Sequence, residues 1–243
     1  MGEGKKVKIA AIGDIHVREN MRGFYRELFM EISDEADVLV LCGDLTDLGK
    51  IEEAENLAED MRACRIPIVC VLGNHDHQSD QEQVVKHILR GNSHVSVLDQ
   101  EPIEHLGIGF AGVKGFIGGF DRFALNAFGE KAIKAIIHER DNEAYALENQ
   151  LKQIEGMEKK VVLLHYAPIR ATVADEPEDI MPFLGSTRFA QIIDQFGASV
   201  VFHGHANAGP MSGKTLGAVP VFNVAYPLLQ NQEPKLQYFL YEL

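Results

Sequence analysis

The sequence contains few cysteines, and their spacing argues against a disulfide framework. Cys42, Cys64 and Cys70 are an odd number and form no C-x-x-C pair. Two of them lie within or beside apolar runs, where a thiol packs as a small hydrophobic group. We therefore expect three unpaired cysteines and a reducing compartment.

Long apolar runs are also missing. No run approaches the roughly 20 residues that a membrane-spanning helix needs. Residues 1–8 lack the apolar stretch of a secretory signal peptide. We therefore expect a cytoplasmic protein with no membrane partner.

Basic residues are scarce relative to acidic ones. The chain has 23 Lys and Arg against 36 Asp and Glu, a formal net charge of -13. Binding to a nucleic-acid duplex depends on clustered Lys and Arg, so the composition argues against such a partner and against a DNA nuclease. Cations are the more natural partners. With 243 residues, 46% of them hydrophobic, we expect one α/β domain spanning residues 1–243.

Short apolar runs alternate with segments of helical periodicity. The expected strands are residues 7–12, 37–41, 68–72, 95–98, 108–113, 160–164, 198–202, 219–224 and 236–241. The expected helices are residues 21–35, 51–64, 84–90, 132–154 and 189–196. In the first helix, Phe24 belongs to the expected apolar stripe with Leu28, Phe29 and Ile32. The alternation predicts a parallel sheet with its ligand site at the carboxyl ends of the strands, and the Pro and Tyr of the last two strands suit sheet edges.

Polar side chains follow five of these strands. They are Asp14 and His16, Asp44, Asn74 and His75, His165, and finally His203, His205 and Asn207. Each alone can be a helix cap or an ordinary polar residue. Together, carboxylate, imidazole and amide groups suit divalent ions such as Mn, Fe, Zn or Ni, and two ions sharing one carboxylate fit the number of ligands. If the strand geometry continues, Asp14 and His16 point the same way.

The ordered motifs resemble those of the calcineurin-like metallophosphoesterase superfamily. They are Asp14-Ile15-His16, Gly43-Asp44-Leu45-Thr46-Asp47, Gly73-Asn74-His75-Asp76, His165 and Gly204-His205-Ala206-Asn207. The match spans residues 14–207. The resemblance implies an αββα sandwich, in which two facing mixed sheets are flanked by helices and the metals lie at the loops between them.

The resemblance also implies roles for individual residues. One divalent metal would take Asp14, His16 and Asp44, and the other would take Asp44, Asn74, His165 and His205, with Asp44 bridging. His75 would act as a proton donor or transition-state stabiliser, with its ring held by the Asp47 carboxylate. We expect manganese in both positions, with iron, zinc or nickel as alternatives. The expected reaction is hydrolysis of a small phosphoester by a bridging hydroxide.

Asn207 departs from the family pattern, which has a histidine completing the first metal's ligands. We expect Asn207 to bind this metal through its amide oxygen, which is a weaker ligand for a transition ion than imidazole. His203 offers an alternative ligand or a supporting residue behind the ligands. The substitution also leaves open a binding or scaffolding protein that keeps the fold with impaired turnover.

A Gly- and Phe-rich segment near residues 114–130 interrupts the regular pattern. Phe116, Phe120 and Phe123 could form a lid that stacks on a base or aryl group, with Arg122 meeting an anion. The alternative is a loop whose phenylalanines pack into the core. Compact members of the resembled family often act on phosphodiesters, so we expect a phosphodiesterase, with a phosphomonoesterase as the alternative. The sequence does not reveal an oligomeric state.

Overall fold

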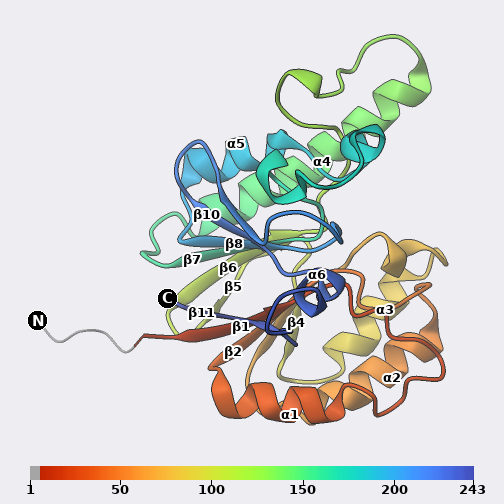
Figure 1. Ribbon diagram of the computed structural model, residues 1–243, viewed down its shortest axis with the longest axis vertical. Coiled ribbons are helices and arrows are strands. Elements are labelled where there is room, and N and C mark those ends of the chain that lie inside the picture. The colour runs from red at the N-terminus through yellow and green to blue at the C-terminus, as the bar shows by residue number, and fades with distance from the viewer. Residues whose placement is uncertain (1–5) are drawn as a thin grey trace, which may run out of the picture.

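Two β-sheets face each other, with helices on both outer sides (Figure 1), in a computed structural model that describes residues 6–243. The first sheet has the order β11 (Phe239–Glu242), β1 (Lys8–Ile12), β2 (Val38–Cys42), β3 (Ile68–Val71) and β4 (Val95–Val97). Strands β1 to β4 are parallel, and β11 runs antiparallel to β1. The predicted αββα sandwich is confirmed.

The second sheet has a parallel centre and antiparallel edges. Its order is β5 (Ile103–His105), β6 (Ile108–Val113), β7 (Lys160–Leu164), β8 (Val200–His203), β10 (Pro220–Asn223) and β9 (Ser212–Lys214). Strands β6, β7, β8 and β10 are parallel, and β5 and β9 run antiparallel to their neighbours. The carboxyl ends of the parallel strands therefore meet at one edge of the sheet.

Five longer helices and several short ones complete the described chain. The longer helices are α1 (Arg26–Glu35), α2 (Ile51–Met61), α3 (Glu82–Arg90), α4 (Lys131–Gln153) and α5 (Thr187–Phe196). The short ones are α6 (Tyr226–Gln230), η1 (His75–His77), η2 (Asp121–Phe123), η3 (Arg170–Val173) and η4 (Glu178–Phe183). Helices α1, α2 and α3 cover the first sheet, and α4 and α5 cover the second (Figure 1). Within residues 6–243, no helix is both long and apolar enough to cross a bilayer.

The central strands are apolar on both faces because both faces are buried. In β1, Ile9 and Ala11 pack between the two sheets, whereas Ala10 and Ile12 pack toward the helices of the first sheet. A strand with period-two side chains reads as a continuous apolar run when each face has its own core. This explains why the strands could be predicted from short apolar runs.

Two details differ from the sequence-based expectations, and two agree with them. Helix α1 begins at Arg26, so Phe24 precedes it and is 62% exposed instead of joining the buried stripe. Strand β10 lies inside its sheet, because β9 pairs with it in the register Pro220↔Lys214. Strand β11 is at an edge as predicted, and the three cysteines are unpaired as predicted.

Candidate metal centre

The loops after β1 and β2 run side by side and carry three of the predicted ligands. Asp14 N donates to the Gly43 carbonyl at 2.9 Å, and His16 N donates to the Asp44 carbonyl at 3.0 Å. This main-chain pairing continues the parallel register of the two strands beyond their ends. It places Asp14, His16 and Asp44 at the edge where ligands bind in parallel sheets.

Four of the predicted ligands have a left-handed backbone. The φ angles are 56° for Asp14, 43° for His16, 48° for Asp44 and 68° for His205. The strand geometry therefore ends before Asp14, and the expected alternation of Asp14 and His16 does not apply. Such conformations cost about 1–3 kcal/mol each in non-glycine residues and concentrate at functional sites.

Two glycines allow the loops to approach this closely. A Cβ on Gly73 would overlap the Asp44 carboxylate, and a Cβ on Gly204 would overlap the Asp14 carboxylate. Glycine is therefore required where each of these loops crosses a predicted ligand.

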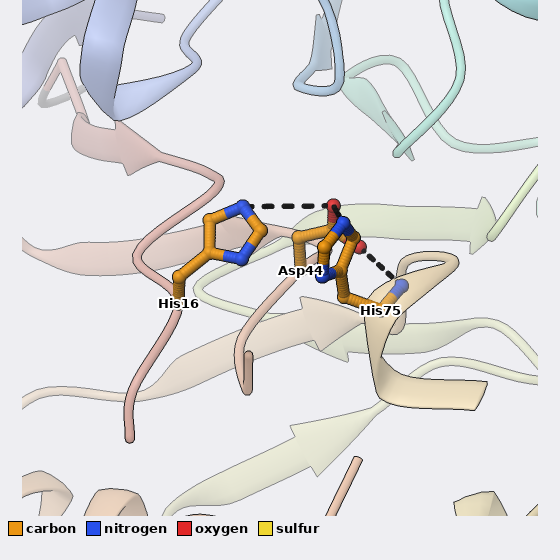
Figure 2. A group of neighbouring side chains, drawn as sticks. All are labelled: His16, Asp44 and His75. Atoms are coloured by element: carbon orange, nitrogen blue, oxygen red, sulfur yellow. Dashed lines mark hydrogen bonds and ion pairs between the residues drawn. The ribbon is translucent and has the colours of Figure 1, made fainter. Parts of the chain in front are cut away.

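The first cluster consists of His16, Asp44 and His75 (Figure 2). His16 Nε2 lies 3.8 Å from Asp44 Oδ2, and His75 Nε2 lies 4.0 Å from the same oxygen. The main-chain N of His75 donates to Asp44 Oδ1 at 2.8 Å, as Figure 2 also shows. The two imidazole rings meet edge to face with centroids 4.5 Å apart. Asp44 thus accepts a hydrogen bond through Oδ1, and its Oδ2 faces the imidazoles of His16 and His75.

The second cluster consists of Asp44, His165 and His205. His165 is completely buried, and its Nδ1 lies 3.1 Å from the Cys42 carbonyl. His205 Nε2 lies 3.1 Å from the Phe183 carbonyl. A carbonyl can only accept, so each ring carries its hydrogen on that nitrogen when neutral. The other ring nitrogen then keeps a lone pair for a cation, as in metal sites whose histidines are oriented from behind.

The charges of the second cluster suit a divalent cation. Burial lowers the pKa of His165 and of His205 to about 3, so both rings are neutral near pH 7. His165 Nε2 lies 2.8 Å from Asn74 Oδ1 and 3.4 Å from Asp44 Oδ1. Three acceptor atoms therefore converge, an arrangement that is unfavourable until a cation lies between them. The donor set fits the divalent metal that the sequence predicts.

The ionised form of the carboxylates in the centre is disfavoured. Burial raises the pKa of Asp14 well above its usual range, and the neighbouring Asp44 raises it further. Burial also raises the pKa of Asp44, against the hydrogen bond from His75 N. A cation would relieve both effects, because it compensates the negative charge that burial disfavours.

Asp47 contacts His75 differently from the expectation. The main-chain carbonyl of Asp47, and not its carboxylate, accepts from His75 Nδ1 at 2.7 Å. The carboxylate instead lies 3.3 Å from His16 Nδ1 and 3.1 Å from Arg18 Nε. Asp47 therefore orients His75 through its backbone, and its carboxylate lies within ion-pair distance of His16.

The remaining predicted ligands lie at the margins of these clusters. Asp14 directs both carboxylate oxygens at His205 N, at 3.0 and 2.9 Å. His203 has both ring nitrogens near protein groups, Nδ1 at 2.8 Å from the Gly204 carbonyl and Nε2 at 2.8 Å from Thr172 Oγ1, which favours a supporting role over ligation. Asn207 is exposed. Ligation by Asp14 and Asn207 stays a prediction.

Comparison with known proteins agrees with this geometry. A sequence profile of the calcineurin-like phosphoesterases matches residues 7–207. The chain belongs to this family. It is 29% identical over 242 residues to a Methanocaldococcus jannaschii protein named "Uncharacterized protein MJ1162", covering 98% of this chain and 93% of that one.

Solved structures share the fold of this calcineurin-like phosphoesterase. Phosphopantetheinyl hydrolase from Mycobacterium tuberculosis aligns with a TM-score of 0.68 and 16% identity, over 99% of this chain and 97% of that chain. The protein TT1561 of Thermus thermophilus aligns with a TM-score of 0.59 and 16% identity, over 98% of this chain and 99% of that chain. At these identities the likeness concerns the fold alone.

The Gly- and Phe-rich segment of this phosphoesterase packs against the core in its first part, whereas residues 121–130 are mostly exposed. Phe120 is 3% exposed and belongs to a small core with Leu184 and Ala206. Phe116 packs against the core beneath α4. Arg122 lies over the exposed Phe123 ring, 4.6 Å from its centroid. The core-packing alternative thus describes Phe116 and Phe120, whereas a lid role for Arg122 and Phe123 stays a prediction.

Asp76 connects the loops after β2 and β3. The sequence had not assigned it a role. Its fully buried carboxylate accepts from Leu45 N, Thr46 N, Thr46 Oγ1 and Gly73 N at 2.6–3.2 Å. The signal was present, because Asp76 is the last residue of the Gly73-Asn74-His75-Asp76 motif. These hydrogen bonds hold the two loops together.

Proposed function

We propose that this calcineurin-like phosphoesterase hydrolyses phosphodiesters at a dinuclear metal centre. The observation that carries the proposal is the position of Asp44, which belongs to both ligand clusters. A carboxylate shared between two sets of imidazoles is what a bridging ligand requires. The first ion would be held by His16 and Asp44 with Asp14, and the second by Asp44, His165 and His205 with Asn74.

The chain's own residues bind and protonate the substrate. Divalent ions bound here would supply an activated water and neutralise phosphoryl oxygens. The Asp47 carbonyl fixes the hydrogen on His75 Nδ1, so His75 Nε2 is the atom that faces the centre. As an imidazolium, His75 donates the Nε2 proton to the departing oxygen. His75 is 41% exposed on its side chain, which leaves it accessible to a substrate.

Charge favours a diester over a monoester. The groove beside the first cluster is lined by Asp14, His16, Arg18 and Asp47 among others. Of the described residues that line it, Arg18 alone is a lysine or arginine, against the two carboxylates of Asp14 and Asp47. A monoester dianion brings roughly twice the negative charge of a diester, and beyond the metal ions the groove offers only Arg18 to balance it.

Two measurements test the proposal together. Metal content is determined on protein purified without chelator, and hydrolysis of bis(p-nitrophenyl) phosphate is compared with that of p-nitrophenyl phosphate in added manganese. We expect two ions per chain, as the two clusters suggest, and faster diester hydrolysis. A faster monoester reaction would make the protein a phosphomonoesterase. One ion or none, without turnover, would favour the alternative that Asn207 suggested, a binding or scaffolding protein with this fold.

A further inference from the structure

An open groove of about 440 Å³ begins at the first ligand cluster. Asp14 and His16 form its inner wall, and Phe24, Tyr226 and Pro227 contribute to its outer wall. A group attached to a phosphate at the metal centre would therefore have this groove beside it. The chemistry of the outer wall indicates what that group is.

The chain holds Phe24 in an exposed position. Asp60, from α2, is 1% exposed, and its carboxylate accepts from Gly23 N at 2.8 Å and from Tyr25 N at 3.0 Å. Gly23 has a φ of +83°, which forms the turn before α1. These bonds fix the main chain on both sides of Phe24, whose side chain is 62% exposed. Phe24 is therefore available to a ligand, because it lines the same groove as Asp14 and His16.

Tyr226 is anchored to the same loop that carries the ligands. Its main-chain N donates to the Gly13 carbonyl at 2.9 Å, directly before Asp14. Tyr25 lies between Phe24 and Tyr226. Its ring centroid is 5.0 Å from that of Phe24 and 6.4 Å from that of Tyr226. The Tyr25 hydroxyl donates to the Ile15 carbonyl at 2.7 Å. The aromatic wall and the ligand loop therefore form one connected unit.

Arg18 brings a positive charge to this groove. Its Nε lies 3.1 Å from Asp47 Oδ2, and its side chain is 61% exposed. Asn56 Nδ2 donates to the Arg18 carbonyl at 3.2 Å, which fixes the backbone. The guanidinium is thus oriented by Asp47 while remaining in contact with solvent, where it can meet an anionic oxygen.

We infer that this groove binds a flat aromatic group, an aryl ring or a nucleobase, of the phosphodiester substrate. Phe24 and Tyr226 contact the ring, and Arg18 attracts the phosphate to which the ring is attached. The inference rests on the proposed function and names its substrate class. It moves the aromatic contacts from the Gly- and Phe-rich segment, where the sequence had predicted them, to the turn before α1.

A binding experiment tests the groove without turnover. Calorimetry in added manganese compares phenylphosphonate with inorganic phosphate for the wild type, Phe24→Ala, Phe24→Tyr, Phe123→Ala and Phe128→Ala. We expect the wild type to prefer phenylphosphonate about tenfold, in line with the stacking of one ring on aromatic side chains. Phe24→Ala should lose most of that preference with unchanged affinity for phosphate. Phe24→Tyr, which keeps the ring, and Phe128→Ala, at an 85% exposed residue, should retain it.

The outcomes separate this inference from the proposed function. Equal affinities in the wild type, or an undiminished preference in Phe24→Ala, would overturn the inference even if diesters are hydrolysed. A preference that disappears in Phe123→Ala but not in Phe24→Ala would also overturn it, since the ring would then lie on the Gly- and Phe-rich segment. A preference that depends on Phe24 without any hydrolysis would support the groove and refute the hydrolase.

Discussion

The roles of His75 and Asp47 are separable at the scale of single residues. His75 Nδ1 meets the main chain of Asp47, and His75 is not among the proposed ligands of either ion, so removing its ring should leave those ligands in place. We expect His75→Ala to lose about 10²–10⁴-fold in kcat, the usual contribution of a positioned proton donor. Metal content, measured on the same preparation, should match the wild type. A kcat within about threefold of the wild type would remove His75 from the reaction, since a positioned proton donor contributes far more.

The Asp47 side chain should act on metal binding instead of proton transfer. Its carboxylate faces His16 Nδ1 at 3.3 Å, and partners of this kind typically contribute about 10–100-fold to metal affinity. We expect Asp47→Asn to need more manganese for half-maximal activity and to approach wild-type kcat when saturated. A titration of activity with manganese measures this. A kcat as low as that of His75→Ala at saturation would restore the role first expected for the carboxylate.

These residues also show which parts of the site the sequence can reveal. The order and spacing of carboxylates and imidazoles indicated which residues gather around Asp44. The groups that orient them are main-chain carbonyls, those of Cys42 and Asp47. Every residue has such a carbonyl, so no residue type marks the ones that matter. Phe24 was wrongly assigned to the buried stripe of the first helix, because helical periodicity does not reveal that α1 begins only at Arg26.

At the scale of elements, Asp76 should determine whether the loops after β2 and β3 stay together. Its buried carboxylate accepts three main-chain hydrogen bonds and one from Thr46 Oγ1. Asp76→Asn would turn an amide donor toward these donors, and an unsatisfied buried group costs about 1–3 kcal/mol. Urea unfolding with chelator present measures the loss separately from metal binding. The control is Asp80→Asn at an exposed residue, and equal stabilities of the two variants would contradict this role.

The elements themselves were predictable to the extent that burial determines their sequence. Central strands such as β2 are buried on both faces and appear as uninterrupted apolar runs. Strand β9 consists of Ser, Gly and Lys and owes its place to pairing with β10, which no periodicity signals. For the same reason, Pro220 suggested an edge although it is only the first residue of an inner strand.

At the scale of the whole molecule, the concentration of negative charge should make stability depend on metal and pH together. Burial, and then the nearby Asp44, raises the pKa of Asp76 from 3.8 to about 6, and burial raises those of Asp14 and Asp44. A carboxyl whose pKa is raised by folding binds more protons in the folded state than in the unfolded state. Its contribution to stability therefore falls as pH rises through this range.

Manganese should reverse this loss, and more strongly at higher pH. Protons compete with the metal for the carboxylates more strongly at about pH 5 than at about pH 7.5, and the cation relieves the repulsion between carboxylates that have lost their protons. With free manganese at about 100 times its Kd, the gain is about 2.7 kcal/mol, or roughly 5–10 °C in Tm for a chain of this size. Thermal unfolding with manganese or chelator at both pH values measures the increment. Asp44→Asn, which removes the shared ligand, should abolish it, and an increment that is equal or larger at the lower pH would show that these carboxylates do not bind the metal.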